Sequence, residues 1–152
     1  MAGKSPKLKP LNASKLKVAV VSASWHPEIC SALIDGAKRA LVANKVKKVT
    51  YHEVSGSFEL PLAAQKLFDS GIDVVVVLGL VLKGDTPHFD YICEGVTNGI
   101  MQVSLSRSKP IGFGVLMCDN LVQAVERSNV GLGIGNKGEE AALAVLALWN
   151  LA

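Results

Sequence analysis

Residues 74–82 read VVVVLGLVL and residues 83–87 read KGDTP, so the longest apolar run of the chain ends in a polar turn. A run of this length and composition is typical of a strand that is buried on both faces of a sheet. After the turn, apolar residues from Phe89 to Val103 recur at helical spacing, the clearest helical pattern in the sequence. A buried strand followed by an amphipathic helix is the repeating unit of a parallel α/β sheet.

The same alternation of strand and helix runs along the rest of the chain. Short apolar segments predict three further strands, at residues 17–23, 46–54 and 111–117. Helical spacing and capping residues predict helices from Pro27 to Leu41, over 59–70, from an Asn120 cap to Arg127, and over 138–152. We therefore expect an α/β fold, a three-layer αβα sandwich around a four-stranded parallel sheet.

Length and charge limit the classes of protein to consider. The 152 residues suit one domain, which we place at residues 15–152, after a flexible arm at residues 1–14 that Pro6 and Pro10 interrupt. The net charge of +3 is too small to indicate nucleic acid binding. Much of the basic character lies in or beside the arm, at Lys4, Lys7, Lys9, Lys15 and Lys17. A solvated tail explains these lysines better than a binding patch, and the start lacks the apolar core of a secretory signal.

The composition is more apolar than usual. Hydrophobic residues make up 49% of the chain, and the mean hydropathy is +0.34. No apolar run approaches the roughly 18 residues that a membrane span needs. We therefore expect the excess apolar surface to be buried between subunits of a homo-oligomer.

The three cysteines, Cys30, Cys93 and Cys118, form no CxxC pair and give no metal-binding signal. An odd number of unpaired cysteines is typical of a reduced, cytoplasmic protein. Each is expected to be a small core residue rather than a nucleophile.

Unusual polar and aromatic residues follow the predicted strands. In parallel sheets, ligands bind beyond the carboxyl ends of the strands. Four segments qualify: residues 24–26, 55–59, 83–88 and 118–120. Trp25 either covers a sheet end or stacks on a planar heterocycle. Glu59 either complements a helix dipole or binds substrate.

The third segment opens a helix, so the backbone N–H groups of Gly84, Asp85 and Thr86 suit a phosphate, although the charge of Asp85 opposes it. His88 follows at the helix start. The positive helix terminus favours its neutral imidazole, which makes it either a general base or a structural cap. Arg127 ends a predicted helix, where a cation is stabilised by the dipole, but its guanidinium also matches phosphate oxygens.

Several common sites are excluded. The sequence contains no GxGxxG, no P-loop and no GxSxG elbow. The glycine-rich residues 131–135 follow a helix rather than a strand, so they are interpreted as part of a connecting loop.

Taken together and in order, these segments resemble the lumazine synthase family. The resemblance runs from about Leu16 to the C-terminus, and its most specific part is KGDTPHFDY at residues 83–91. It also includes Ser24-Trp25, GSFELP at 56–61, FGVL at 113–116, Gln123-Ala124 with Arg127, and NKGEEAA at 136–142. It implies a flavodoxin-like fold and a condensation of 5-amino-6-ribitylaminouracil with 3,4-dihydroxy-2-butanone 4-phosphate. No metal and no organic cofactor is implied.

The resemblance also implies a role for each site residue. Trp25 would stack on the pyrimidine, and Ser57, Phe58 and Glu59 would hold the ring and the ribityl chain. Leu80, Val81 and Leu82 would line the pocket, Asp85 and Thr86 would meet the phosphate, and His88 would shuttle protons. Phe113 and Arg127 would come from a neighbouring subunit, with Arg127 on the phosphate. Lys137 is a lesser candidate near the site.

The chain departs from relatives at two positions outside the proposed chemistry: Lys83 replaces a common arginine, and Val122 a common glutamate. The segment between Arg127 and Lys137 also looks slightly longer than in shell-forming relatives, which favours a pentamer over a sixty-subunit capsid. Three other functions remain open: a shell-forming or scaffold protein, a flavodoxin-like phosphate or flavin binder without turnover, and an archaeal-type riboflavin synthase.

Overall fold

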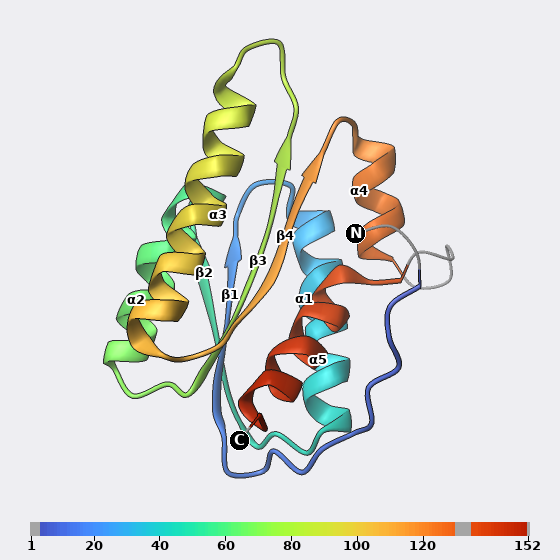
Figure 1. Cartoon of the computed structure of the whole chain (residues 1–152). Helices are drawn as coiled ribbons and strands as arrows, with labels where there is room; N and C mark the ends of the chain where they lie inside the picture. Colours follow the sequence, from blue (N-terminus) through green and yellow to red (C-terminus); the bar gives the residue numbers. More distant parts are fainter. Residues whose placement is uncertain (1–3, 130–134, 152) are drawn as a thin grey trace.

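The computed structural model describes residues 4–129 and 135–151, which form a four-stranded parallel sheet covered by helices on both faces (Figure 1). The strands are β1 (Lys17–Ala23), β2 (Lys48–Val54), β3 (Val74–Leu82) and β4 (Ile111–Cys118). Their order across the sheet is β2-β1-β3-β4, and all three pairings are parallel. The predicted α/β class and parallel sheet are confirmed.

Five α-helices connect or follow the described strands. They are α1 (Pro27–Ala43), α2 (Leu60–Asp69), α3 (His88–Arg107), α4 (Leu121–Ser128) and α5 (Lys137–Trp149), with a single 3-10 turn η1 (Ser57–Glu59) before α2. Figure 1 shows α2 and α3 on one side of the sheet and α1, α4 and α5 on the other. This confirms the three-layer sandwich. None of the described helices is long and apolar enough to cross a membrane.

The valine run explains why the sheet is buried on both faces. Along β3, Val74, Val76 and Leu78 pack into the cluster beneath α1, α4 and α5. The alternating Val75 and Val77 pack into the cluster beneath α2 and α3. Because side chains of a strand alternate between faces, a continuous apolar run is what a central strand between two helical layers requires.

Some element boundaries differ from the predictions for local reasons. The second strand starts at residue 48 rather than 46, because Lys45 adopts a left-handed φ of 61° and the Val46 N–H closes the end of α1 on the Leu41 carbonyl (3.0 Å). The predicted helix 59–70 divides into η1 and α2.

At the C-terminus, α5 begins at Lys137 and ends at Trp149, so the predicted extension to residue 152 was wrong. The Asn150 amide donates to the Leu146 carbonyl (2.9 Å) and ends the helix. Of the glycine-rich segment predicted to be a loop, residues 131–134 lie outside the described residues.

The amino ends of the strands are tied together by polar contacts, and we call this edge of the sheet the amino end. Arg107 at the end of α3 donates to both carboxylate oxygens of Asp69 at the end of α2 (2.9 and 3.1 Å). This guanidinium holds the pKa of the Asp69 carboxyl below its ordinary value. Lys109 donates to the Ile72 carbonyl (2.7 Å), and its ammonium lies 5.5 Å from the centre of the Phe68 ring.

Asn44 ties the arm to the same end. Its side-chain oxygen accepts the Leu11 N–H, and its side-chain amino group donates to the Ala40 carbonyl (2.8 Å). The backbone carbonyl of Asn44 accepts the Ala13 N–H (2.9 Å).

The carboxyl ends of β1 and β3 lie where the chain direction across the sheet reverses. The connection after β1 crosses the face covered by α1 and leads outward to β2, whereas the connection after β3 crosses the α3 face and leads to β4. Such a switch point leaves a crevice between the two outgoing connections. We call this edge the carboxyl end and look for the site there.

Candidate active site

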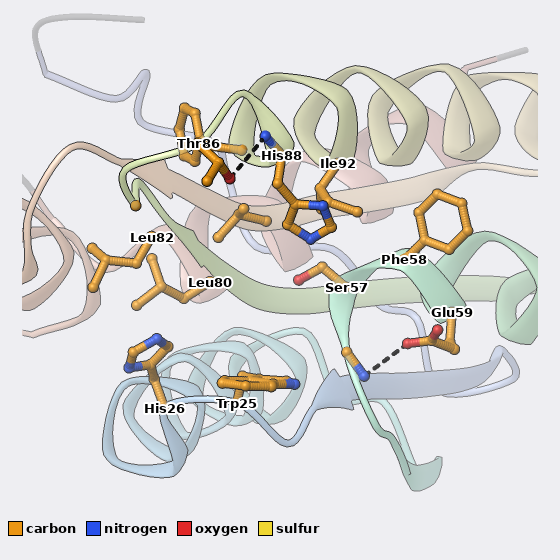
Figure 2. A pocket seen from close by; sticks show the side chains of 14 residues that line it. Trp25, His26, Ser57, Phe58, Glu59, Leu80, Leu82, Thr86, His88 and Ile92 are labelled. Carbon is orange, nitrogen blue, oxygen red and sulfur yellow. Dashed lines mark hydrogen bonds between the residues drawn. The ribbon is translucent and has the colours of Figure 1, made fainter.

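A pocket of about 650 Å³ lies at the carboxyl end, at the switch point between β1 and β3. Four segments form the pocket. They are the turn after β1, the turn after β2, the end of β3, and the loop and first turn that begin α3. Its lining residues are Trp25, His26, Gly56, Ser57, Phe58, Glu59, Leu80, Val81, Leu82, Gly84, Thr86, His88, Phe89 and Ile92. Figure 2 shows Trp25 and His26 on one side of the cavity and Thr86, His88 and Ile92 on the other.

Trp25 and His26 reach the pocket from the turn between β1 and α1. Trp25 keeps 68% of its surface exposed, which leaves the face of a large aromatic ring available to a ligand. His26 has φ 55° and ψ 65°, the left-handed conformation. A residue before proline strongly prefers an extended backbone, so His26, which precedes Pro27, is strained. The strain directs the imidazole toward the cavity (Figure 2).

The turn after β2 supplies polar groups at the pocket wall. One carboxylate oxygen of Glu59, Oε2, accepts the Gly56 N–H (2.9 Å), which fixes the 3-10 turn. Glu59 therefore stabilises the turn by a hydrogen bond to the backbone, a contact that the helix-dipole interpretation did not include. Its other oxygen, Oε1, has no hydrogen-bond partner among the described residues, and the side chain is exposed, so it remains available to a ligand.

Ser57 is the clearest polar anomaly of the site. Its hydroxyl oxygen is buried and has no hydrogen-bond partner within the described part of the chain. A buried hydroxyl left without a partner costs about 1–3 kcal/mol, so it usually meets a ligand or water. A Cβ atom on Gly79 would come within 2.7 Å of this oxygen. Glycine in the central strand therefore makes space for the serine at the pocket wall.

An apolar wall and a helix start complete the pocket. Leu80, Val81 and Leu82 end β3 and supply the wall. At the start of α3, the His88 N–H donates to Thr86 Oγ1 (3.4 Å). The His88 side chain does not cap the helix, and Figure 2 shows the imidazole directed into the cavity. Asp85 is exposed in the preceding loop and does not line the pocket.

Phe113 and Arg127 do not line this pocket. Phe113 pairs with Val77 in the sheet, three positions before the Leu80–Leu116 pair. At about 3.3 Å per residue, it lies about 10 Å below the level of the pocket wall. It lines a separate hollow of about 590 Å³ on the outer side of β4, together with Lys137. Arg127 lies on α4, where it donates to the Gln123 carbonyl (3.0 Å).

The comparisons with known proteins agree with this geometry. The family model described as 6,7-dimethyl-8-ribityllumazine synthase matches residues 15–152. The chain belongs to this family. A 6,7-dimethyl-8-ribityllumazine synthase of Streptomyces coelicolor is 45% identical over 148 residues, covering 97% of this chain and 92% of the relative. One of Kineococcus radiotolerans is 49% identical over 142 residues, covering 93% and 88%.

Membership of the lumazine synthase family gives the geometry a chemical meaning. An exposed indole faces an imidazole across an apolar cavity, and polar groups of the η1 turn stand at one side. This arrangement can hold a flat heterocycle by stacking, orient a hydroxylated chain, and transfer protons.

The cysteines are not part of this chemistry. Cys30 and Cys118 are buried and Cys93 is half-buried. Burial raises the pKa of each thiol, which disfavours the reactive thiolate. The prediction that the cysteines are core residues is confirmed for Cys30 and Cys118. Within residues 4–129 and 135–151, no group of three potential ligands gathers at metal-binding geometry.

Sequence reasoning missed four lining residues, His26, Gly56, Phe89 and Ile92. His26 stood in a segment that follows a strand, but its left-handed backbone has no signature in the sequence. Phe89 and Ile92 were interpreted only as part of the apolar stripe of the helix. In a helix that begins at a pocket, apolar residues of the first turns can face either the core or the cavity. Helical periodicity alone cannot tell core residues from pocket residues.

Proposed function

We propose that this chain acts as a 6,7-dimethyl-8-ribityllumazine synthase and that the pocket at the carboxyl end is its active site. The reaction condenses 5-amino-6-(D-ribitylamino)uracil with 3,4-dihydroxy-2-butanone 4-phosphate in riboflavin biosynthesis. The main support is that the exposed ring of Trp25 faces His88 across one cavity. The segments that form this cavity are the ones in which the family resemblance is found.

The pyrimidine substrate binds beside Trp25. Its flat ring stacks on the indole, and the apolar wall of Leu80, Val81 and Leu82 covers its other side. The ribityl hydroxyls bond to the free Oε1 of Glu59 and to the unpartnered hydroxyl of Ser57. Phe58, which is 60% exposed, closes the outer rim.

The phosphate of the second substrate binds at the start of α3. Backbone N–H groups of a first helical turn have no intrahelical acceptor and carry a partial positive charge, so they suit an anion. Asp85 and Thr86 lie in the bend just before this turn, which begins at His88, and contribute their backbone N–H groups beside it. The exposed carboxylate of Asp85 opposes the phosphate charge, so a cation from elsewhere is needed for tight binding.

Arg127 of a neighbouring subunit supplies this cation, and Phe113 of the same neighbour covers the substrates. Both residues lie outside the pocket of their own chain, at or beyond the outer strand β4. Apolar side chains left exposed on α4, Leu121, Val122 and Val125, further support a homo-oligomer. We favour a pentamer over a sixty-subunit capsid.

His88 moves the protons of the reaction. The amine of the pyrimidine attacks the ketone carbon and loses a proton as the C–N bond forms. The carbinolamine loses a first water to give an imine. Removal of a C–H proton then expels phosphate as its C–O bond breaks and leaves an enol, which becomes the second carbonyl. The ribityl-bearing nitrogen attacks this carbonyl, closing the ring with release of a second water. His88 accepts and returns protons at its imidazole, while binding supplies the orientation. No metal and no organic cofactor is required for these steps.

Two further assignments remain predictions. The catalytic domain comprises residues 15–152, with residues 1–14 as an arm outside it. A cytoplasmic location rests on the unpaired cysteines alone.

The test is turnover of both substrates, followed by lumazine fluorescence against a reaction without protein. We expect acceleration, and we expect Arg127→Ala to weaken the phosphate substrate more than the pyrimidine. Equal losses for both substrates would point to an assembly defect. Binding of a ribityl pyrimidine without acceleration would favour a binding module or a scaffold protein.

A mixed oligomer tests whether two subunits share a site. Trp25→Ala and Arg127→Ala chains are each expected to be nearly inactive alone. After joint refolding, random assembly in a ring should restore about a quarter of the sites, because each site then draws Trp25 and Arg127 from different chains. The unmixed variants, refolded in the same way and of the same assembly size, are the control. No recovery in the mixture would contradict the shared site.

A further inference from the structure

We infer that Asn136 is a positioning residue for the phosphate substrate, because its side chain fixes the end of α4, which carries Arg127, to the start of α5, which carries Lys137. The inference rests on the proposed function, in which Arg127 binds the phosphate. Asn136 does not contact the substrate itself. It acts by fixing the backbone segments that carry these two cations.

All four hydrogen-bonding positions of the Asn136 amide are used. The carbonyl oxygen Oδ1 accepts the N–H groups of Gly138 (2.9 Å) and Glu139 (3.0 Å) and so caps α5. The amino group Nδ2 donates to the carbonyls of Ser128 (2.6 Å) and Ala32 (2.9 Å). One side chain therefore joins α5, the last residue of α4, and the middle of α1.

The surroundings of this amide make the joint rigid. Asn136 is only 4% exposed and Ser128 only 1%, so water competes for neither. Gly36 of α1 lies directly against the amide, and a Cβ atom at position 36 would overlap it. Glycine at 36 and asparagine at 136 therefore fit as a pair, and α1 provides the surface on which α4 and α5 meet.

Asparagine is the residue type that this joint requires. Two backbone carbonyls need donors and two backbone N–H groups need an acceptor, and a primary amide of this length supplies both. Aspartate keeps the acceptor for Gly138 and Glu139. It offers no donor to Ser128 and Ala32, and its second oxygen would face their carbonyl oxygens.

The two cations are attached to their own helices by local contacts. Arg127 donates to the Gln123 carbonyl (3.0 Å) and pairs with Glu126 (3.6 Å). Lys137 pairs with Glu140 (2.7 Å). Neither set of contacts links α4 to α5, whereas Asn136 bonds directly to the residue after Arg127 and precedes Lys137. The relative placement of the two cations therefore depends on Asn136.

The test compares Asn136→Asp with Asn44→Asp as a matched control. Asn44 is the other extensively bonded buried asparagine described above; it is 2% exposed and donates to the Ala40 carbonyl (2.8 Å) at the amino end. Both variants should lower stability. We expect Asn136→Asp to raise the KM for the butanone phosphate about tenfold, the loss associated with one or two misplaced hydrogen bonds. The KM for the pyrimidine should change less than twofold.

Gly36→Ala is an independent disturbance of the same joint from α1. The added methyl group would overlap the Asn136 amide and force it to move, although all its hydrogen-bonding atoms remain, so a rise of the same KM is expected. Equal rises of both KM values, or a pattern matching Asn44→Asp, would overturn the inference.

Arg127→Ala in the same assay separates the two proposals. If it raises the KM for the phosphate substrate selectively and neither Asn136→Asp nor Gly36→Ala does, only the positioning role fails. If Arg127→Ala shows no such selectivity, the phosphate site of the proposed function fails, and the role of Asn136 fails with it.

Discussion

The two ends of the sheet are built differently. At the amino end, polar side chains have partners: Asp69 and Arg107 pair through two bonds, and the buried amide of Asn44 is bonded on both sides. At the carboxyl end, the buried hydroxyl of Ser57 has no partner among the described residues, and His26 is held in a left-handed conformation.

This difference separates stability from function within one small domain. Bonded polar groups at one end stabilise the fold. Unpartnered polar groups, exposed aromatic rings and backbone strain at the other end lower the free energy of unfolding, and a bound ligand can offset this loss. Substitutions at the amino end should therefore change the free energy of unfolding, and substitutions at the carboxyl end should change turnover.

The largest expected effect is the loss of a core side chain at the amino end. Phe68, near the end of α2, is 4% exposed and packs into the cluster between α2, α3 and the sheet. Phe68→Ala should reduce the free energy of unfolding by about 3–5 kcal/mol, measured by chemical denaturation at fixed subunit concentration. The kcat and both KM values of the folded protein should remain within twofold. A tenfold loss of kcat in folded protein would show that the two ends are coupled.

An intermediate effect is expected at His88, the proposed proton-transfer residue. His88→Ala should lower kcat by about 10–100-fold, since general-base catalysis contributes about 10²–10⁴-fold at most and the reactants are themselves reactive. The free energy of unfolding should change by less than about 0.5 kcal/mol, because the side chain is exposed. His52→Ala, an exposed histidine on β2, is the control. Unchanged turnover would remove His88 from the mechanism.

The smallest effect should be the most diagnostic, because stability and activity should move in opposite directions. His26→Gly relieves the left-handed strain and should raise the free energy of unfolding by about 1 kcal/mol. It also removes an imidazole from the pocket, so kcat/KM should fall about fivefold, the value of one hydrogen bond.

Lys45→Gly is its counterpart at the amino end. Lys45 has a similar φ of 61° but is exposed and far from the pocket, so the gain in stability should come without loss of activity. Full activity in His26→Gly would mean that the strain at position 26 serves no function.

The sequence predicted elements better than it predicted their arrangement. The valine run identified β3 because a short, continuous run of β-branched residues between turns suits a strand buried on both faces. Asn120 capped α4 as expected, accepting the Gln123 N–H (3.0 Å). The strand order and the distribution of helices between faces depend on tertiary packing, which local periodicity does not record. The predicted start of β2 was two residues too early for a similar reason. Val46 is apolar, as a strand residue would be, but its N–H donates to the Leu41 carbonyl at the end of α1.

The site was predictable to the extent that position in a parallel sheet predicts it. Trp25, Glu59 and His88 follow or begin the right elements, and the structure brings them to one pocket. Three aspects were not accessible from the residues alone: the strain at His26, the missing partner of Ser57, and the bond from Asn136 to Ser128. The first is a backbone conformation, the second is the absence of a contact, and the third joins residues eight positions apart, and none of these leaves a pattern in the sequence.

The chain contains two tryptophans, and they lie at opposite ends of the sheet. Trp25 borders the pocket, whereas Trp149 lies beside residues 12–16 at the amino end. Their emission therefore reports on the two ends independently. With Trp149 changed to phenylalanine, the remaining indole is a built-in optical probe: a pyrimidine stacked on it as proposed should quench it at once, while slow assembly or unfolding should alter it on a separate timescale. Ligand occupancy and subunit integrity can thus be followed by light alone, without attaching a dye.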